Sequence, residues 1–314
     1  MITTVTLNAA IDKVYLLDNF ETNRVNRVAA VKAQPGGKGN NVAKVAKLLG
    51  SDVTACCFLG GENGSFIHRQ LTERGIRSVP VWIEDQTRIA LNLIDRVRGT
   101  QTEILEPGPQ IQPAEWLALQ NQMIGLAANS KVVSFSGSLP RDLPVHAYAE
   151  LLAAVKRAGP ITILDTSGQA LSAGIEGAPF LCKPNRDELK ELVGHDAQSP
   201  TEVISAARYL HRRGVEMVLV SLDSEGSILV TRNKAWKVTP PAIRPVNTVG
   251  CGDALVAGIA YYLDQHGRTD ESGLIESVIW GTAAAASNAL YPVAGHVNRT
   301  EVEQFVPQIQ VVEL

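Results

Sequence analysis

The second half of the chain alternates apolar strand-like runs with amphipathic helical stretches, and this alternation limits the possible fold most strongly. The helical patterns at 113–127, 144–158 and 201–213 are each followed by a short apolar run, at 131–135, 161–165 and 217–222. Parallel neighbouring strands need crossover helices of this kind. The sequence therefore predicts an α/β fold with a mostly parallel central sheet and helices on both faces.

Two polar stretches, 11–34 and 79–106, interrupt this core at separate points. The second contains three alternating runs typical of a small antiparallel set, at Val79–Glu84, Arg88–Asp95 and Gln101–Leu105. We expect the two stretches to meet in space as a discontinuous β-sheet lid over a core made of residues 1–10, 35–78 and 107–314. A small sheet leaves exposed edges that a second subunit can cover, so we also expect a homodimer through the lids.

Polar residues follow nearly every predicted strand, at the edge where open α/β sheets bind ligands. They occur at Asn8 and Asp12 and again at 136–138, 165–168, 183–185 and 221–226. One polar strand end is an ordinary turn, but five or six of them at the same edge predict a ligand site.

The octapeptide Asn247–Ala254 is a turn with two glycines that leads directly into an apolar helical pattern. Backbone N–H groups at a helix start are unpaired and carry the positive end of the helix dipole. Gly250 and Gly252 let this backbone approach a ligand, which predicts a cradle for a phosphate. Asp253 would repel an anion, so its presence indicates a base beside the phosphate, as phosphoryl transfer to a hydroxyl requires. The alternative is a plain helix start with Asp in its first turn.

The charge balance restricts the class of partner. The chain has 29 Lys and Arg against 32 Asp and Glu, a net charge of −3, which argues against nucleic acid as the main partner. No apolar run reaches membrane-span length, and residues 1–5 lack the basic start of a signal peptide. The four cysteines have no metal-binding spacing. We therefore expect a soluble cytoplasmic protein that has no membrane partner.

Four motifs in a fixed order resemble those of the ribokinase-like PfkB carbohydrate kinases. They are Gly36-Gly37-Lys38-Gly39-Asn40-Asn41-Val42-Ala43, Ser136-Gly137-Ser138-Leu139-Pro140, Lys183-Pro184-Asn185-Arg186-Asp187-Glu188-Leu189 and Asn247–Ala254. The opening Thr6-Leu7-Asn8, with Ile11-Asp12, is similar to the phosphosugar branch, which contains 1-phosphofructokinase and tagatose-6-phosphate kinase. The resemblance implies a kinase that uses ATP and Mg²⁺ to convert a ketohexose monophosphate to the bisphosphate.

Fructose 1-phosphate, giving fructose 1,6-bisphosphate, is the first substrate expected from this resemblance, and tagatose 6-phosphate is the second. A ribokinase-like kinase of an unphosphorylated sugar or nucleoside stays open as an alternative. A catalytically silent sugar-phosphate sensor is a third possibility, which the intact Asp253 argues against.

The resemblance also implies roles for individual residues. Asp253 would take the proton from the attacking hydroxyl, and the amides of Gly250, Cys251 and Gly252 would stabilise the transferred phosphoryl group. The substrate-binding residues would be Asp12, Arg27, Gly36, Gly37, Lys38, Asn41, Arg88, Ser136 and Asp253. The ATP-binding residues would be Lys183, Asn185, Ser221, Asp223, Glu225, Gly226, Gly250, Gly252 and Asn288.

Asn185 and Glu188 would hold Mg²⁺ through waters, although the same pair at this spacing is typical of a helix cap. Arg27, Lys38 and Arg88 would neutralise the substrate phosphate, whereas most single cations are ordinary surface charge. The family usually has Gly at the position of Asp223 and Ala at that of Cys251, which puts the geometry of the nucleotide loop in question.

Overall fold

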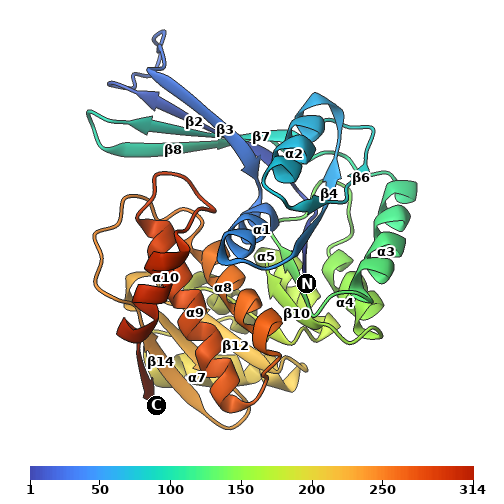
Figure 1. The fold of residues 1–314 in the computed structure, drawn as a ribbon, viewed down its shortest axis with the longest axis vertical. Coiled ribbons are helices and arrows are strands. Elements are labelled where there is room, and N and C mark those ends of the chain that lie inside the picture. Colours follow the sequence, from blue (N-terminus) through green and yellow to red (C-terminus); the bar gives the residue numbers. More distant parts are fainter.

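A computed structural model describes all residues, 1–314, as a large central sheet with a smaller second sheet beside it (Figure 1). The central sheet has the order β15-β14-β13-β12-β11-β10-β9-β1-β4-β5, with β6 also paired to β4. Its strands are β1 (Ile2–Thr6), β4 (Val53–Leu59), β5 (Arg77–Ser78), β6 (Val81–Trp82), β9 (Val132–Ser136), β10 (Ile161–Asp165), β11 (Leu181–Cys182), β12 (Met217–Ser221), β13 (Ser227–Val230), β14 (Ala235–Thr239) and β15 (Gln310–Glu313). All pairs from β5 to β12 are parallel, and only β12 to β15 pair antiparallel.

Helices cover both faces of this sheet, as the alternating pattern predicted. One face carries α1 (Lys38–Leu49), α2 (Gly61–Glu73), α8 (Cys251–His266), α9 (Glu271–Ala289) and α10 (Arg299–Phe305). The other carries α3 (Pro113–Ala127), α4 (Ala147–Lys156), α5 (Gly168–Gly174), α6 (Arg186–Val193) and α7 (Pro200–Arg212). Each face has its own buried core, and neighbouring residues such as Cys56 and Cys57 belong to different cores. None of the helices combines the length and the apolarity needed to cross a bilayer.

The second sheet has four strands in the order β3-β2-β7-β8. They are β2 (Ala10–Leu17), β3 (Ala30–Gly36), β7 (Arg88–Asp95) and β8 (Thr100–Leu105). Strands from the two polar stretches pair directly, because β2 runs parallel to β7 over its whole length, from Ala10↔Arg88 to Leu17↔Asp95. Figure 1 shows this sheet projecting from the core as a separate layer.

One expectation for the second sheet is wrong. The run Val79–Glu84 does not join it: β6 within this run pairs with β4 of the central sheet, and Val81 and Ile83 are buried in the core. The other two runs of that set pair antiparallel as expected, in β7 and β8, while β7 pairs parallel with β2 on its other side. Alternation of apolar residues identifies a strand, but it does not identify the partner of that strand.

Candidate active site

A cleft of about 1030 Å³ is lined both by the second sheet and by the carboxyl ends of the central strands. The polar residues that follow successive strands meet here, as their positions predicted: Asn8 after β1, Ser138 after β9, Asp165 at the end of β10, Lys183 after β11 and Ser221 at the end of β12. The second sheet contributes Asp12, Arg88 and Asn92. The cleft therefore lies where ligands bind in open α/β sheets.

The structure brings most of the predicted site residues to this cleft. Those that line it are Asp12, Gly37, Lys38, Asn41, Arg88, Lys183, Asn185, Glu188, Ser221, Asp223, Gly226, Gly250, Cys251, Gly252 and Asp253. Those that do not line it are Arg27, Gly36, Ser136, Glu225 and Asn288.

The five residues outside the cleft have other contacts. Arg27 is exposed in the connection between β2 and β3, and Glu225 forms an ion pair with Arg186 at 2.9 Å. Ser136 is buried, with its Oγ 3.0 Å from Ser134 Oγ. Asn288 is also buried, and its side-chain amide donates to Val249 O at 3.0 Å.

Gly36 supports a site residue rather than lining the cleft. A Cβ at this position would overlap the carboxyl group of Asp12 on the neighbouring strand. Only glycine leaves room for that side chain to point into the cleft.

The predicted anion turn forms the start of α8. Gly250 is the N-cap residue with φ of 81°, a left-handed conformation that glycine adopts without strain. It packs tightly, since a Cβ here would lie 2.9 Å from the Cβ of Ala294. The amide of Cys251 donates to Thr248 O at 3.2 Å, whereas the amides of Gly250 and Gly252 have no partner and lie at the positive end of the α8 dipole, in residues that line the cleft.

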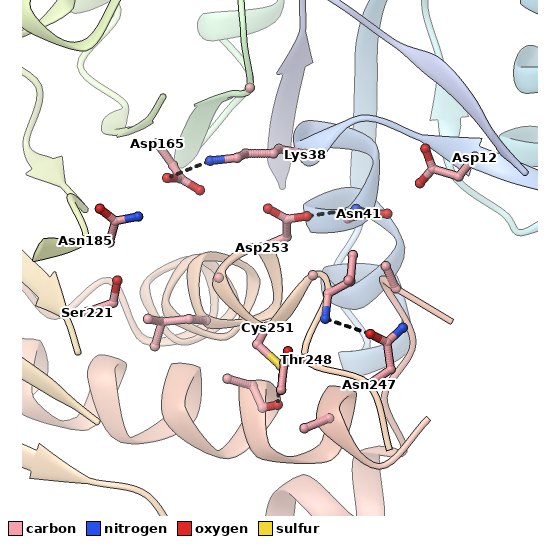
Figure 2. A pocket seen from close by; sticks show the side chains of 18 of the residues that line it. Asp12, Lys38, Asn41, Asp165, Asn185, Ser221, Asn247, Thr248, Cys251 and Asp253 are labelled. Atoms are coloured by element: carbon pink, nitrogen blue, oxygen red, sulfur yellow. Dashed lines mark hydrogen bonds and ion pairs between the residues drawn. The ribbon is translucent and has the colours of Figure 1, made fainter. Parts of the chain in front are cut away.

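Asp253 lies in the first turn of α8 and is buried, only 6% exposed. Its Oδ2 accepts a hydrogen bond from Asn41 Nδ2 at 2.8 Å (Figure 2). Burial raises the pKa of Asp253 to about 7, and the neighbouring charge of Asp165 adds to this, while Lys38, the Asn41 bond and Lys183 act in the opposite direction. A carboxyl group with this pKa is suited to accept a proton near neutral pH.

Asp165 is a central residue of the site that was not among the predicted site residues. Its Oδ1 lies 3.2 Å from Lys183 Nζ and 3.6 Å from Lys38 Nζ, and the side chain is 1% exposed. Burial would raise the pKa of Asp165, but the two ammonium groups outweigh that effect and lower it. The signal in the sequence was its position at the end of a buried strand, which alone does not distinguish a site residue from a turn residue.

Lys38, which was expected at the substrate phosphate, forms an ion pair with Asp165. Figure 2 shows its side chain extending to Asp165, on the side of Asp253 away from Asp12. The charge of Asp165 raises the pKa of Lys38, against the effect of burial, and Asp253 and Glu188 contribute in the same direction. Lys38 therefore stays charged at the Asp165 end of the cleft.

The other end of the cleft contains polar atoms without partners. Arg88 donates weakly to Asn8 O at 3.3 Å and to Glu106 O at 3.4 Å, but its buried Nε has no partner. The same is true of buried oxygens that line the cleft on Thr6, Asn8, Asn41 and Asn92. A buried polar group without a partner costs about 1–3 kcal/mol, so this cluster indicates a polar ligand. Sequence reasoning missed Thr6 and Asn92.

Asp12 stands beside this cluster on β2. Burial raises the pKa of Asp12 to about 6, while the charges of Lys44 and Arg88 lower it. An acceptor of this kind is suited to bind hydroxyl groups.

The third part of the cleft has an apolar wall with a polar loop beside it. The wall includes Pro240, Pro241, Ile243, Pro245 and Ala289. The loop contains Ser221, Asp223 and Gly226. Asp223 has φ of 51°, a left-handed conformation in which glycine would be less strained. This departure from the expected family pattern therefore has a local conformational cost.

Asn185 and Glu188 form the helix cap that was the alternative to a metal site. Asn185 Oδ1 accepts from Glu188 N at 2.8 Å, and Glu188 Oε2 accepts from Asn185 N at 2.9 Å. Both side chains line the cleft, and Oε1 of Glu188 takes part in no hydrogen bond. Together with the partnerless Oδ2 of Asp165, it supplies the kind of oxygen that Mg²⁺ prefers. The residues present therefore fit Mg²⁺ bound through waters as well as a cap.

Comparisons with known proteins agree with this geometry. The sequence pattern of the pfkB family carbohydrate kinases matches residues 5–300. A tagatose-6-phosphate kinase from Staphylococcus epidermidis is 37% identical, and the match covers 100% of both chains. A 1-phosphofructokinase from Haemophilus influenzae is 32% identical over 96% of this chain and 99% of that protein. The crystal structure of phosphofructokinase-2 from Escherichia coli in complex with fructose-6-phosphate has a TM-score of 0.89 at 27% identity, covering 98% of each chain. The chain therefore belongs to the pfkB family of carbohydrate kinases, which are phosphotransferases.

Proposed function

We propose that this kinase transfers the γ-phosphoryl group of ATP to a hydroxyl group of a ketohexose monophosphate and forms the bisphosphate. The observation that carries the proposal is the buried carboxyl group of Asp253, with a pKa of about 7, in the first turn of a helix whose amides face the cleft. This arrangement places a base next to an anion cradle, which is what phosphoryl transfer to a hydroxyl requires.

The sugar lies between the second sheet and Asp253. Asp12 and Asn41 accept or donate hydrogen bonds to its hydroxyl groups, and the close backbone at Gly37 completes this wall. Arg88, with its free Nε, binds the phosphate group of the substrate. These contacts use the buried polar atoms that otherwise have no partner.

ATP lies along the remaining part of the cleft. The apolar wall at 240–245 takes the base, and the triphosphate extends toward α8. Asp253 then takes the proton of the attacking hydroxyl, and the unpartnered amides of Gly250 and Gly252 with Lys38 and Lys183 stabilise the charge of the transferred group. Asn185 and Glu188 would hold Mg²⁺, which neutralises phosphate charge when bound.

The relatives divide between two substrates of this class. The 37% identical relative is named tagatose-6-phosphate kinase, and the 32% identical relative is named 1-phosphofructokinase. We place tagatose 6-phosphate ahead of fructose 1-phosphate on this difference in identity, which reverses the order expected from the motifs alone.

A coupled assay of ADP release tests the proposal. The panel contains tagatose 6-phosphate, fructose 1-phosphate, fructose 6-phosphate, free fructose and free ribose. A phosphosugar should exceed both free sugars by about 100-fold or more in kcat/KM, because the Arg88 contacts are charge-assisted. Preference for a free sugar, or no ADP release with any of the five, would overturn it.

A further inference from the structure

The loop Pro292–His296, between α9 and α10, contacts both the second sheet and the anion turn. Ala294 and Gly295 in this loop are buried. None of the predicted site residues is in this loop, yet its backbone receives side chains from β3, α1, α9 and the turn before α8. Through a loop with these four neighbours, a movement of one part of the cleft can shift another part.

On the side of the second sheet, the contact point is the carbonyl oxygen of Ala294. Gln34 Nε2 donates to it at 3.1 Å, and Lys44 Nζ donates to it at 3.2 Å. Gln34 is on β3 directly opposite Asp12, and Lys44 also donates to Pro35 O at 2.9 Å. The strand that supports Asp12 is thus tied to the loop.

On the side of the anion turn, the loop is held by two asparagines. Asn288 Oδ1 accepts from Gly295 N at 2.9 Å, while Asn288 Nδ2 donates to Val249 O at 3.0 Å. Asn247 Nδ2 donates to Pro292 O at 3.1 Å. Because Asn288 is fully buried, its two bonds fix the loop and the turn relative to each other.

Direct packing adds to these bonds. Gly250, whose amide group begins the cradle, sits against Ala294 so closely that a Cβ would lie 2.9 Å from the Ala294 Cβ. Because the two residues are in close contact, a shift of Ala294 toward Gly250 displaces the backbone of the turn.

We propose that the Pro292–His296 loop couples the second sheet to the anion turn, with Gln34 as the positioning residue at the sheet end. When the sheet lies over the cleft as it does here, Gln34 holds Ala294, and the loop sets the amides of 250–252. When the sheet moves away, the bond from Gln34 breaks and the turn loosens. The coupling between the second sheet and the anion turn does not depend on a substrate. That a bound phosphosugar brings the sheet over the cleft rests on the proposed function.

Hydrogen exchange in the ligand-free protein tests the coupling without reference to any substrate. Gln34→Ala removes the bond, and Gln34→Glu removes the donor but keeps the size of the side chain. Each should raise exchange at the amides of Val249, Cys251 and Gly295 by about 3- to 10-fold, the effect expected from one lost hydrogen bond. Gln101→Ala is the matched control, since Gln101 is exposed on β8 of the same sheet. Exchange unchanged in both Gln34 variants, or raised equally by the control, would overturn the proposal.

Kinetics give the second readout. Both Gln34 variants should lower kcat by about 3- to 10-fold with the preferred phosphosugar, whereas Gln101→Ala should keep it. An unchanged kcat would refute the link between the loop and catalysis. If the wild type turns over no phosphosugar, the proposed function fails, but the exchange measurement still decides the coupling.

Discussion

Asp253 and Asp165 are both buried carboxyl groups at one end of the cleft, but their surroundings shift their pKa values in opposite directions. Burial raises the pKa of Asp253 to about 7, and its hydrogen bond from Asn41 does not offset this. Asp165 has two ammonium groups within 3.6 Å, and its pKa is lowered. Under the proposed function, Asp253 would exchange a proton, while Asp165 stays charged beside the two lysines.

Asp253→Asn tests the proton-accepting role. The amide keeps the shape and can still accept the bond from Asn41, so the fold and ATP binding should be retained. Turnover should fall by about 10²–10⁴, the usual scale for loss of a general base. Thermal unfolding provides the control for structure. A variant with nearly full kcat would show that another group takes the proton.

The same group predicts the pH dependence of the wild type. The carboxyl must be unprotonated to accept a proton, and its pKa in the free protein is about 7. We therefore expect kcat/KM to be constant above this pH and to fall about tenfold for each unit below it. A profile that stays flat from about pH 5.5 to 8 would contradict the assignment.

The prediction that the substrate is a phosphorylated sugar is tested at Arg88. Arg88→Ala should raise KM for the phosphosugar by about 10- to 100-fold, since it removes charge-assisted hydrogen bonds. KM for ATP should change much less. Arg141→Ala is a matched control, because Arg141 lies near Arg88 but outside the main cleft, paired with Asp85 at 3.1 Å. Equal effects of the two substitutions would argue against a phosphate site at Arg88.

At the scale of elements, the start of α6 combines a helix cap with the Mg²⁺ site that we propose. Glu188→Gln keeps an acceptor for the amide of Asn185, so the free energy of unfolding should change by less than about 1 kcal/mol. The lost charge should raise the Mg²⁺ concentration needed for half-maximal activity several-fold. Glu202→Gln is the control, since Glu202 forms the same capping box with Ser199 on α7, away from the cleft. An unchanged Mg²⁺ requirement in Glu188→Gln would leave the cap as the only role.

Strong local patterns were enough to predict most elements. The start of α8 at Cys251 follows from the glycine before it, and the parallel core follows from strands that alternate with helices. The short elements α5 and β15 were missed, because seven and four residues carry too little periodicity to be recognised. The strand at Val81–Trp82 was recognised, but its partner depends on tertiary packing.

The site residues also separate into those that local sequence patterns reveal and those that only the fold reveals. Asp12, Asn41 and Asp253 stand in local motifs, and the fold brings all three to the cleft. Asp165 and Asn92 could not be chosen from sequence, because they are recognised by their surroundings in the fold. Asp165 has two lysines beside it, and the side-chain oxygen of Asn92 has no hydrogen-bond partner. A position in a motif is visible in sequence, but burial without a partner is visible only in the folded chain.

At the scale of the whole molecule, the second sheet exposes apolar side chains on both of its edge strands and on a connecting segment. Val25, Val31, Ile104 and Leu105 are each more than half exposed. We expect a homodimer in which this sheet is covered by a second copy, because exposed strands with apolar groups favour pairing. Analytical ultracentrifugation at micromolar concentration should give twice the chain mass, and Ile104→Lys should shift the protein toward monomer. A monomeric wild type would contradict this expectation.

The place of β1 has a consequence for how the chain is made. β1 precedes all other strands of the central sheet in the chain, yet it lies inside the sheet, between β4 and β9. Ile2 pairs with Val132, so one edge of β1 has no partner until the ribosome has added β9. Unpaired apolar edges of this kind are prone to pair with other chains. We therefore expect a nascent chain that ends before β9 to aggregate more readily than the complete chain, in which both edges of β1 are paired.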